Sequence, residues 1–189
     1  MRKIILASQS PRRKELLGEI VSEYEIIPSH ADETVPENIK TDEIVIYLAL
    51  LKARDIAKSH KEDIVIGADT IVIVDDEVLN KPKDKDDAKR MLKLLSGRRH
   101  KVCTGCALVC GEYEHSFCVE TQVEFFELTD EEIDSYIETG DCMDKAGAYG
   151  IQSQGKTLVE GIYGDYYNVV GLPVGKLKRE LLSFLSGLE

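Results

Sequence analysis

Two kinds of hydrophobic pattern alternate along this chain. Residues 4–7 and 64–74 are near-continuous apolar runs rich in Ile and Val, which is typical of strands buried on both faces. Between and after them, apolar residues recur at helical spacing. This spacing predicts a long helix capped by Thr41, a second helix through residues 88–95 and a final helix through residues 177–185. The alternation predicts an α/β fold.

The remaining pattern adds three smaller elements. Residues 24–28 read as a short strand closed by proline, and residues 101–110 and 116–127 read as a hairpin turning at residues 111–112. A capping box at residues 129–132 starts a helix that runs to about residue 137. We find no internal repeat and no linker, so residues 1–189 are expected to form a single domain.

The stretch Ser-Gln-Ser-Pro-Arg-Arg at residues 8–13 follows the first strand directly. Ser10 and Pro11 are typical of a helix N-cap and first helical position. Arg12 and Arg13 then fall in the first turn, where the helix dipole disfavours cations. Either an anion binds across this helix start, or the arginines pair with nearby carboxylates in a solvated turn.

Two charged side chains interrupt apolar patterns. Asp69 lies inside the strong strand at residues 64–74, and aspartate is rarely buried unless it is paired or bound to a metal. A structural ion pair would explain it, but we favour a catalytic or metal-binding carboxylate. Gly67 nearby suggests that something approaches the backbone closely. Lys52 lies on the apolar stripe of its helix, where it either reaches the surface or points inward to a site.

A second loop, residues 144–152, also has functional character. It contains Gly147 and Gly150 beside Lys145, so its backbone N–H groups could approach a phosphate. An ordinary tight turn is the alternative, because the loop fits neither the Walker nor the dinucleotide-binding motif.

Composition narrows the function further. The net charge of -11 argues against a nucleic-acid partner, and no segment has the length of a membrane span or the plan of a signal peptide. We therefore expect a cytoplasmic protein that does not bind membranes. The five cysteines are expected to be reduced, because their number is odd and no secretory context is present. Their spacing fits no four-ligand zinc site, so buried free cysteines are expected.

Taken together, the segments resemble the Maf family of nucleoside triphosphate pyrophosphatases along nearly the whole chain. The resemblance rests on the order and spacing of five segments rather than on any one of them. They are residues 8–13, residues 32–34 (Asp-Glu-Thr), residues 67–70 (Gly-Ala-Asp-Thr), residues 81–82 (Lys-Pro), and residues 144–152 together with 168–173.

The resemblance implies an α/β fold like that of the inosine triphosphate pyrophosphatases, with a long twisted mixed sheet, flanking helices and two lobes around a central cleft. It implies hydrolysis of a nucleoside triphosphate to the monophosphate and pyrophosphate with a divalent metal, and it favours a homodimer. Arg12, Thr70 and Gln152 match the family branch that acts on dTTP and UTP rather than the branch that prefers 7-methyl-GTP. A nucleotide-binding regulator of septum formation, with incidental turnover, is the alternative.

The residues and the resemblance together suggest a role for each group. Asp69 is the expected general base, and Glu33 is expected to hold Mg²⁺ or Mn²⁺ with it, although Glu33 could also be an ordinary surface acid. Gln152 offers a donor and an acceptor that match the edge of uracil or thymine, with Thr70 beside the base or sugar. The expected triphosphate-binding groups are Ser8, Arg12, Arg13, Lys52, Lys81 and Lys145. Of these, Arg13, Lys52 and Lys81 are also expected to be catalytic, by holding the charge that develops during the reaction.

Overall fold

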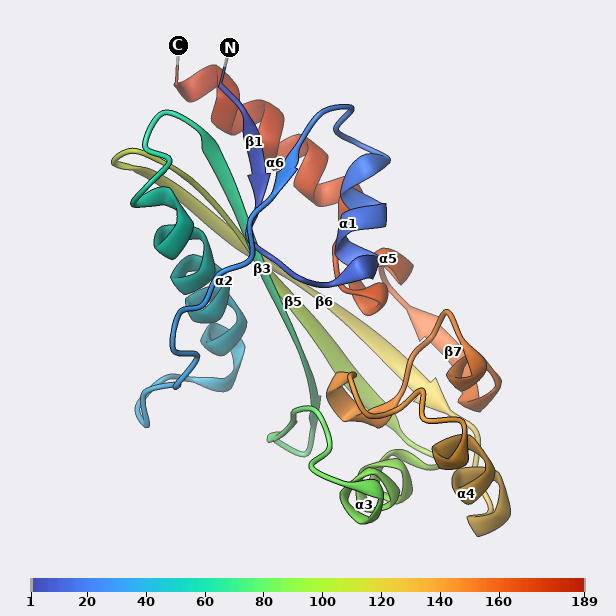
Figure 1. The fold of residues 1–189 in the computed structure, drawn as a ribbon. Coiled ribbons are helices and arrows are strands. Elements are labelled where there is room, and N and C mark those ends of the chain that lie inside the picture. Colours follow the sequence, from blue (N-terminus) through green and yellow to red (C-terminus); the bar gives the residue numbers. More distant parts are fainter. Residues whose placement is uncertain (1, 189) are drawn as a thin grey trace. The chain divides into compact units, whose positions relative to one another are not determined.

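The computed structural model describes residues 2–188, apart from the side chain of Asp42, and contains a seven-stranded mixed sheet with helices (Figure 1). The strand order is β2-β1-β3-β5-β6-β7, and β4 pairs with β3. β1 (Ile4–Leu6) is parallel to β2 (Glu25–Ile26) and to β3 (Ile64–Val74), whereas β4 (Glu77–Leu79) is antiparallel to β3. The expected α/β class is confirmed.

The other elements include four that the sequence pattern did not predict, namely the two 3₁₀ helices, the last strand and the short helix before the final one. In chain order, the other elements are α1 (Pro11–Gly18), α2 (Thr41–Ala57), α3 (Lys85–Leu95), β5 (Arg99–Cys110), β6 (Tyr113–Phe125), α4 (Asp130–Glu138), the 3₁₀ helices η1 (Ala146–Ala148) and η2 (Gln154–Leu158), β7 (Val159–Tyr163), α5 (Tyr166–Val170) and α6 (Val174–Gly187). One expectation is wrong. Thr41 is the first residue of α2 rather than its cap, because Lys40 has the extended cap backbone and makes no side-chain cap hydrogen bond.

The described residues divide into two compact units. The first comprises residues 2–69, 104–119 and 171–188, and the second comprises residues 70–103 and 120–170. Each unit has its own group of buried apolar residues. Within residues 2–188, no helix combines the length and the apolar character needed to cross a membrane.

In the first unit, α2 packs on the sheet through alanines. Ala49, Ala53 and Ala57 repeat every four residues along one face of the helix and are buried against Ile5 and Val65 of the neighbouring strands. Because alanine side chains are small, the helix backbone comes very close to the strands. α2 therefore covers this face of β3 closely (Figure 1).

Glycines in the strands make this close packing possible. A Cβ atom at Gly67 of β3 would lie only 2.1 Å from the carbonyl oxygen of Ala49, and one at Gly105 of β5 would lie 2.3 Å from that of Val45. Any side chain at either position would push α2 away. The close approach expected at Gly67 is confirmed, and the approaching group is the helix.

In the second unit, α3 and α4 supply much of the core. Met91 and Leu92 of α3 and Ile133 of α4 are buried together with Phe125 of β6. The capping box of α4 is present as expected, with Thr129 and Glu132 each bonded to the other's backbone N–H. The helix start is therefore fixed by neighbours in sequence, independently of the core.

We expect Gly67→Ala to lower the free energy of unfolding by about 3 kcal/mol, because its methyl group would overlap the Ala49 carbonyl and displace α2. Urea unfolding measures this difference. Gly187→Ala in α6 is the control, since no atom lies within 4 Å of its added Cβ, and its change should stay below about 1 kcal/mol. Equal stability of the two variants would contradict the packing argument.

Candidate active site

The start of α1 is built as the sequence predicts. The Ser10 hydroxyl accepts a hydrogen bond from the Arg13 backbone N–H at 3.4 Å, and Pro11 occupies the first turn. Ser8 is nearly buried, and its hydroxyl accepts from the Ser10 N–H at 3.3 Å. These two serines fix the path of the chain from β1 into the helix, so the direction in which Arg12 and Arg13 leave the backbone is fixed as well.

Arg13 is held by oxygens of its own unit. Its guanidinium donates to the Gly171 carbonyl at 2.8 Å, to the Ala68 carbonyl at 2.9 Å and to the Ser8 hydroxyl at 3.4 Å. Burial lowers the pKa of Arg13, and the nearby Asp69 carboxylate opposes that shift. Arginine remains charged at neutral pH under such conditions, so Arg13 places a fixed positive charge beside Asp69.

Lys52 joins two of the expected functional carboxylates. Its ammonium lies 2.6 Å from Asp69 Oδ1 and 2.9 Å from Glu33 Oε2. The Lys52 and Asp69 side chains are only 12% and 15% exposed, whereas Glu33 is 53% exposed. Lys52 therefore points inward, as the functional interpretation of its apolar stripe predicts.

The packing of α2 explains this contact. Residues 67 and 69 of β3 point to the same face of the sheet, because side chains alternate along a strand. Gly67 lies directly under α2, so the Asp69 side chain points toward the same helix. Ala49 of α2 lies over Gly67, and Lys52 is about one helical turn after Ala49. Lys52 therefore lies over Asp69 and donates a hydrogen bond to it.

The loop that carries Glu33 is tied to α2 by a residue that the sequence analysis missed. Asp55 accepts hydrogen bonds from the Ser29 hydroxyl at 2.9 Å and from the His30 N–H at 3.2 Å. Asp32 then bonds the N–H and hydroxyl of Thr34, which forms a tight turn around Glu33. The pattern gave no signal for Asp55, because its partners lie 25 and 26 residues earlier in the chain.

In the second unit, Lys81 and Thr70 occupy different environments. Lys81 is exposed and forms no ion pair with any residue in the described part of the chain, whereas Thr70 is half-buried. The Asn80 carbonyl accepts a hydrogen bond from the Gly147 N–H at 3.1 Å. The basic segment around Lys81 is therefore attached to the loop formed by residues 144–153.

That loop has an unusual backbone. Gly147 and Ala148 both have positive φ values, 69° and 59°, and a Cβ atom at Gly147 would lie 2.9 Å from the Val72 side chain. Left-handed backbone at alanine costs about 1 kcal/mol, so the surroundings must hold it. The loop therefore contains a 3₁₀ helix and a strained residue, which an ordinary tight turn does not need.

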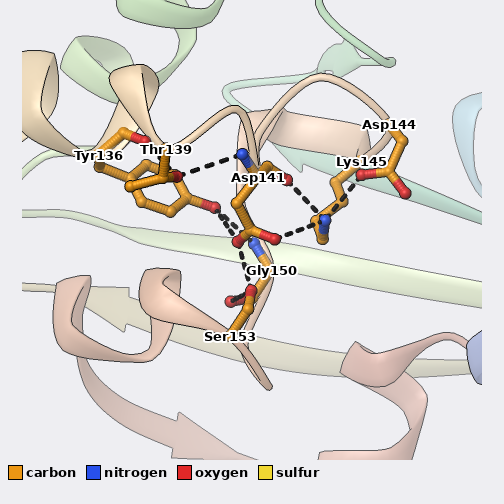
Figure 2. Close-up of polar contacts among 7 residues, drawn as sticks. All are labelled: Tyr136, Thr139, Asp141, Asp144, Lys145, Gly150 and Ser153. Atoms are coloured by element: carbon orange, nitrogen blue, oxygen red, sulfur yellow. Dashed lines mark hydrogen bonds and ion pairs between the residues drawn. The ribbon is translucent and has the colours of Figure 1, made fainter.

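Lys145 and Gln152 lie at the two ends of this loop. The Lys145 ammonium bonds the Asp141 carbonyl at 2.5 Å and the carboxylates of Asp141 and Asp144 at 3.0 and 2.7 Å (Figure 2). Gln152 is exposed, and within residues 2–188 its side chain forms no hydrogen bond. A role for Gln152 in stabilising the loop by side-chain hydrogen bonds therefore has no support in the structure.

Asn168 begins the last matched segment, residues 168–173, and its side chain binds other residues of the second unit. Its side-chain amide is buried and donates to the Val102 carbonyl and to the Thr121 hydroxyl, both at 2.9 Å. Asn168 therefore has a structural role, because its buried amide holds its segment to β5 and β6. Asp141, Tyr136 and Ser153 are further residues that the sequence analysis missed, and only the spacing of Asp141 and Lys145, four residues apart, could have suggested a pair.

Comparison with known proteins supports what these segments suggest. The sequence model of a family described as "Maf-like protein" matches residues 3–184. The chain belongs to the Maf family. Among its relatives, a protein of Bacillus cytotoxicus named dTTP/UTP pyrophosphatase is 52% identical over 99% of this chain and 98% of its own length. A Bacillus cereus protein with the same name is 50% identical over 97% and 96%.

Solved structures show the same fold outside the close relatives. The Ham1 protein of Staphylococcus aureus superposes with a TM-score of 0.57 and 16% identity, covering the whole of both chains. The HAM1 protein of Coxiella burnetii gives a TM-score of 0.56 and 17% identity over 97% of this chain and all of its own. These neighbours agree with the fold that the family resemblance implies.

The donor set around Lys52 fits the expected Mg²⁺ or Mn²⁺ only in part. Glu33 and Asp69 direct carboxylate oxygens at one cation, Lys52, and such oxygens are the ligands that these metals prefer. Among the residues the structure describes, no three His, Cys, Asp or Glu side chains gather as a complete metal cage. Mg²⁺ usually takes one or two protein carboxylates and completes its coordination with water or phosphate oxygens, so Glu33 and Asp69 would supply only part of its ligands.

The loop in this Maf protein rests on a buried aromatic cluster. His100 Nε2 lies 2.8 Å from the Tyr149 hydroxyl, and both rings contact Phe125 edge to face. His100 is only 2% exposed, and burial lowers its pKa from 6.5 to about 4. His100 is therefore neutral in the folded protein at neutral pH.

We expect the free energy of unfolding to fall as the pH decreases from about 6.5 to about 4. The unfolded chain binds a proton at His100 below pH 6.5, whereas the folded chain resists it until about pH 4. The loss amounts to roughly 3 kcal/mol from this group. Urea unfolding at several pH values should show that His100→Gln lacks this part of the acid dependence. The same pH dependence in both proteins would contradict the assignment.

Proposed function

We propose that this protein hydrolyses dTTP and UTP to the nucleoside monophosphate and pyrophosphate. The observation that carries the proposal is the 52% identity, over nearly the full length of both chains, to a relative named dTTP/UTP pyrophosphatase. The contact between Lys52 and the two carboxylates supplies a site with suitable chemistry. A homodimer and a cytoplasmic location, expected from the sequence, stay predictions.

In this reaction, the oxygen of water bonds to the α-phosphorus, and the bond from that phosphorus to the bridging oxygen breaks. Pyrophosphate leaves with the electron pair, and a proton of the water must pass to an acceptor. Asp69 is the proposed acceptor. Its Oδ1 atom is bonded to Lys52, and Oδ2 forms no hydrogen bond with the residues described, so Oδ2 can take the proton.

Lys52 and Arg13 support this role electrostatically. Lys52 holds the Asp69 carboxylate in one orientation on a rigid strand, and Arg13 is fixed beside it by backbone carbonyls. A base that is already oriented loses little freedom when the substrate binds. Both cations also stabilise the negative charge that develops on the leaving pyrophosphate.

A divalent cation is part of the proposal, with Glu33 and Asp69 as its protein ligands. When bound, such a cation neutralises phosphate charge and orients the triphosphate. Glu33 suits this role because it is about half exposed and is presented by the turn that Asp32 forms. Asp55 contributes indirectly, since it anchors the loop to α2.

Selection of the base is assigned to Gln152, with Arg12 and Thr70 as further contributors. The exposed Gln152 amide can donate to a carbonyl and accept from an N–H, which matches the N3–H and carbonyl edge of uracil and thymine. Cytosine lacks that N–H, so it leaves part of the amide unpaired. Lys81, which is exposed, is the proposed phosphate ligand of the second unit.

A panel of nucleoside triphosphates assayed for pyrophosphate release tests the proposed function. With Mg²⁺ or Mn²⁺, we expect dTTP and UTP to react faster than CTP and 7-methyl-GTP by tenfold or more, since about 1.4 kcal/mol of lost pairing corresponds to tenfold. Faster cleavage of 7-methyl-GTP would contradict the substrate class. Tight binding of UTP with negligible release of product would favour a nucleotide-binding regulator instead.

We expect Asp69→Asn to reduce the rate of pyrophosphate release by about 10² to 10⁴-fold while UTP binding remains measurable by calorimetry. The amide keeps the shape of the side chain but cannot accept the proton at neutral pH. Asp63→Asn is the control, because Asp63 is a carboxylate of the same unit that bonds the Lys3 N–H and lies near His60. Near-normal turnover of Asp69→Asn would rule out Asp69 as the base.

A further inference from the structure

Lys145 is fully engaged by its own loop. A lysine ammonium has three N–H donors, and here three oxygens accept from it: the Asp141 carbonyl, Asp141 Oδ1 and Asp144 Oδ1, at 2.5 to 3.0 Å. Its side chain is only 11% exposed. Two carboxylates already balance its charge. The geometry is therefore that of a fixed structural contact at the start of the loop.

Asp141 is the centre of this arrangement, as Figure 2 shows. One carboxylate oxygen accepts from Lys145, and the other accepts from the Tyr136 hydroxyl at 2.9 Å and from the Ser153 hydroxyl. Burial raises the pKa of Asp141, but the bonds from Ser153, Lys145 and Tyr136 outweigh it and leave the pKa below its ordinary value. Asp141 is therefore ionised at neutral pH and binds both ends of the loop.

Tyr136 extends the network to the middle of the loop. Its hydroxyl donates to Asp141 and accepts from the Gly150 N–H at 3.1 Å. The ring is anchored because Tyr136 belongs to α4 and is 5% exposed. The Thr139 hydroxyl also accepts from the Asp141 N–H at 3.2 Å, which fixes Asp141 to the end of the same helix. The loop is thus attached to α4 directly at residue 150, and through Asp141 at residues 145 and 153.

Gln152 lies between two of these attachment points. Ser153 is bound to Asp141 and to the Gly150 carbonyl, and Ile151 is buried at 7% exposure. Gln152 itself is exposed, and its amide forms no hydrogen bond within the described part of the chain. The backbone at Gln152 is consequently fixed by its neighbours, while its side chain is left available to a ligand.

We infer that Asp141 is a positioning residue for base selection, which orders the loop so that Gln152 is presented in a fixed place without Asp141 touching the nucleotide. The inference rests on the proposed function of Gln152 in reading uracil or thymine. A fixed amide discriminates between bases because it cannot move to satisfy the wrong edge. A loosened loop must be ordered during binding, which weakens binding of the preferred base most.

The test compares UTP and CTP in Asp141→Ala and in a matched control. Asp141→Ala should lower kcat/KM for UTP by about tenfold, mainly through a higher KM, while the value for CTP changes little. The ratio of UTP to CTP therefore falls. Asp134→Ala removes another aspartate bound to a lysine in the second unit, at 2.6 and 2.7 Å from Lys89, and should keep the ratio unchanged. An unchanged ratio in Asp141→Ala would overturn the inference, even if kcat/KM falls equally for both nucleotides.

Two further variants keep the inference testable if Asp141→Ala folds poorly. Ser153→Ala and Tyr136→Phe each remove one hydroxyl from the network and leave the rest of the side chain in place. Each should lower the UTP to CTP ratio in the same direction, by a smaller factor. Wild-type selectivity in both variants would count against the positioning role.

A measurement that is independent of turnover separates this inference from the proposed function. Amide hydrogen exchange should accelerate in residues 145–153 of Ser153→Ala and Tyr136→Phe, and not in the Glu33 loop of the first unit. Slow exchange in the variants would refute the ordering role even if UTP is a substrate. Wild-type protein that fails to hydrolyse UTP and dTTP would refute the proposed function, while fast exchange in the variants would still support the ordering of the loop by Asp141.

Discussion

The contact between α2 and β3 at Gly67 is the constraint on which the chemistry of the first unit depends. The Ala49 carbonyl lies where a side chain at residue 67 would begin, so the helix and the strand are as close as backbones can be. At this separation, Lys52 on the helix reaches Asp69 on the strand at 2.6 Å. A larger residue at position 67 would alter the core and the contact between Lys52 and Asp69 together.

The Lys52 contact also explains how an acidic protein can provide a site for a polyanion. The chain carries a net charge of -11, which repels a triphosphate at long range. At short range, Lys52 and Arg13 place two positive charges beside Asp69 in a partly buried setting, where charges interact more strongly than in water. For the proposed binding of a triphosphate, the positive charges beside Asp69 therefore matter more than the net charge of the protein.

The second unit uses a different device, in which one partly buried carboxylate binds both ends of a strained loop. Ala148 has left-handed backbone that it would not adopt by itself, and the bonds that Asp141 makes to Lys145 and Ser153 hold the loop around it. Rigid elements position Asp69, the proposed general base, whereas side-chain hydrogen bonds position the loop that carries Gln152. We therefore expect the proposed selection of the base to be more sensitive than the fold to the loss of a single polar group.

The sequence by itself determined most of the elements and identified most of the residues of interest. The bounds of β3 and the capping box of α4 follow from patterns among neighbouring residues, and Asp69 stood out because a lone carboxylate in a buried strand requires a partner. The family segments then indicated the reaction. The tertiary structure decided which groups meet, because those contacts join residues distant in the chain. Asp55 escaped the sequence analysis for this reason, since an aspartate that binds a distant serine leaves no local pattern. For Asp141, the spacing to Lys145 was the one local signal, and its bond to Ser153 gave none.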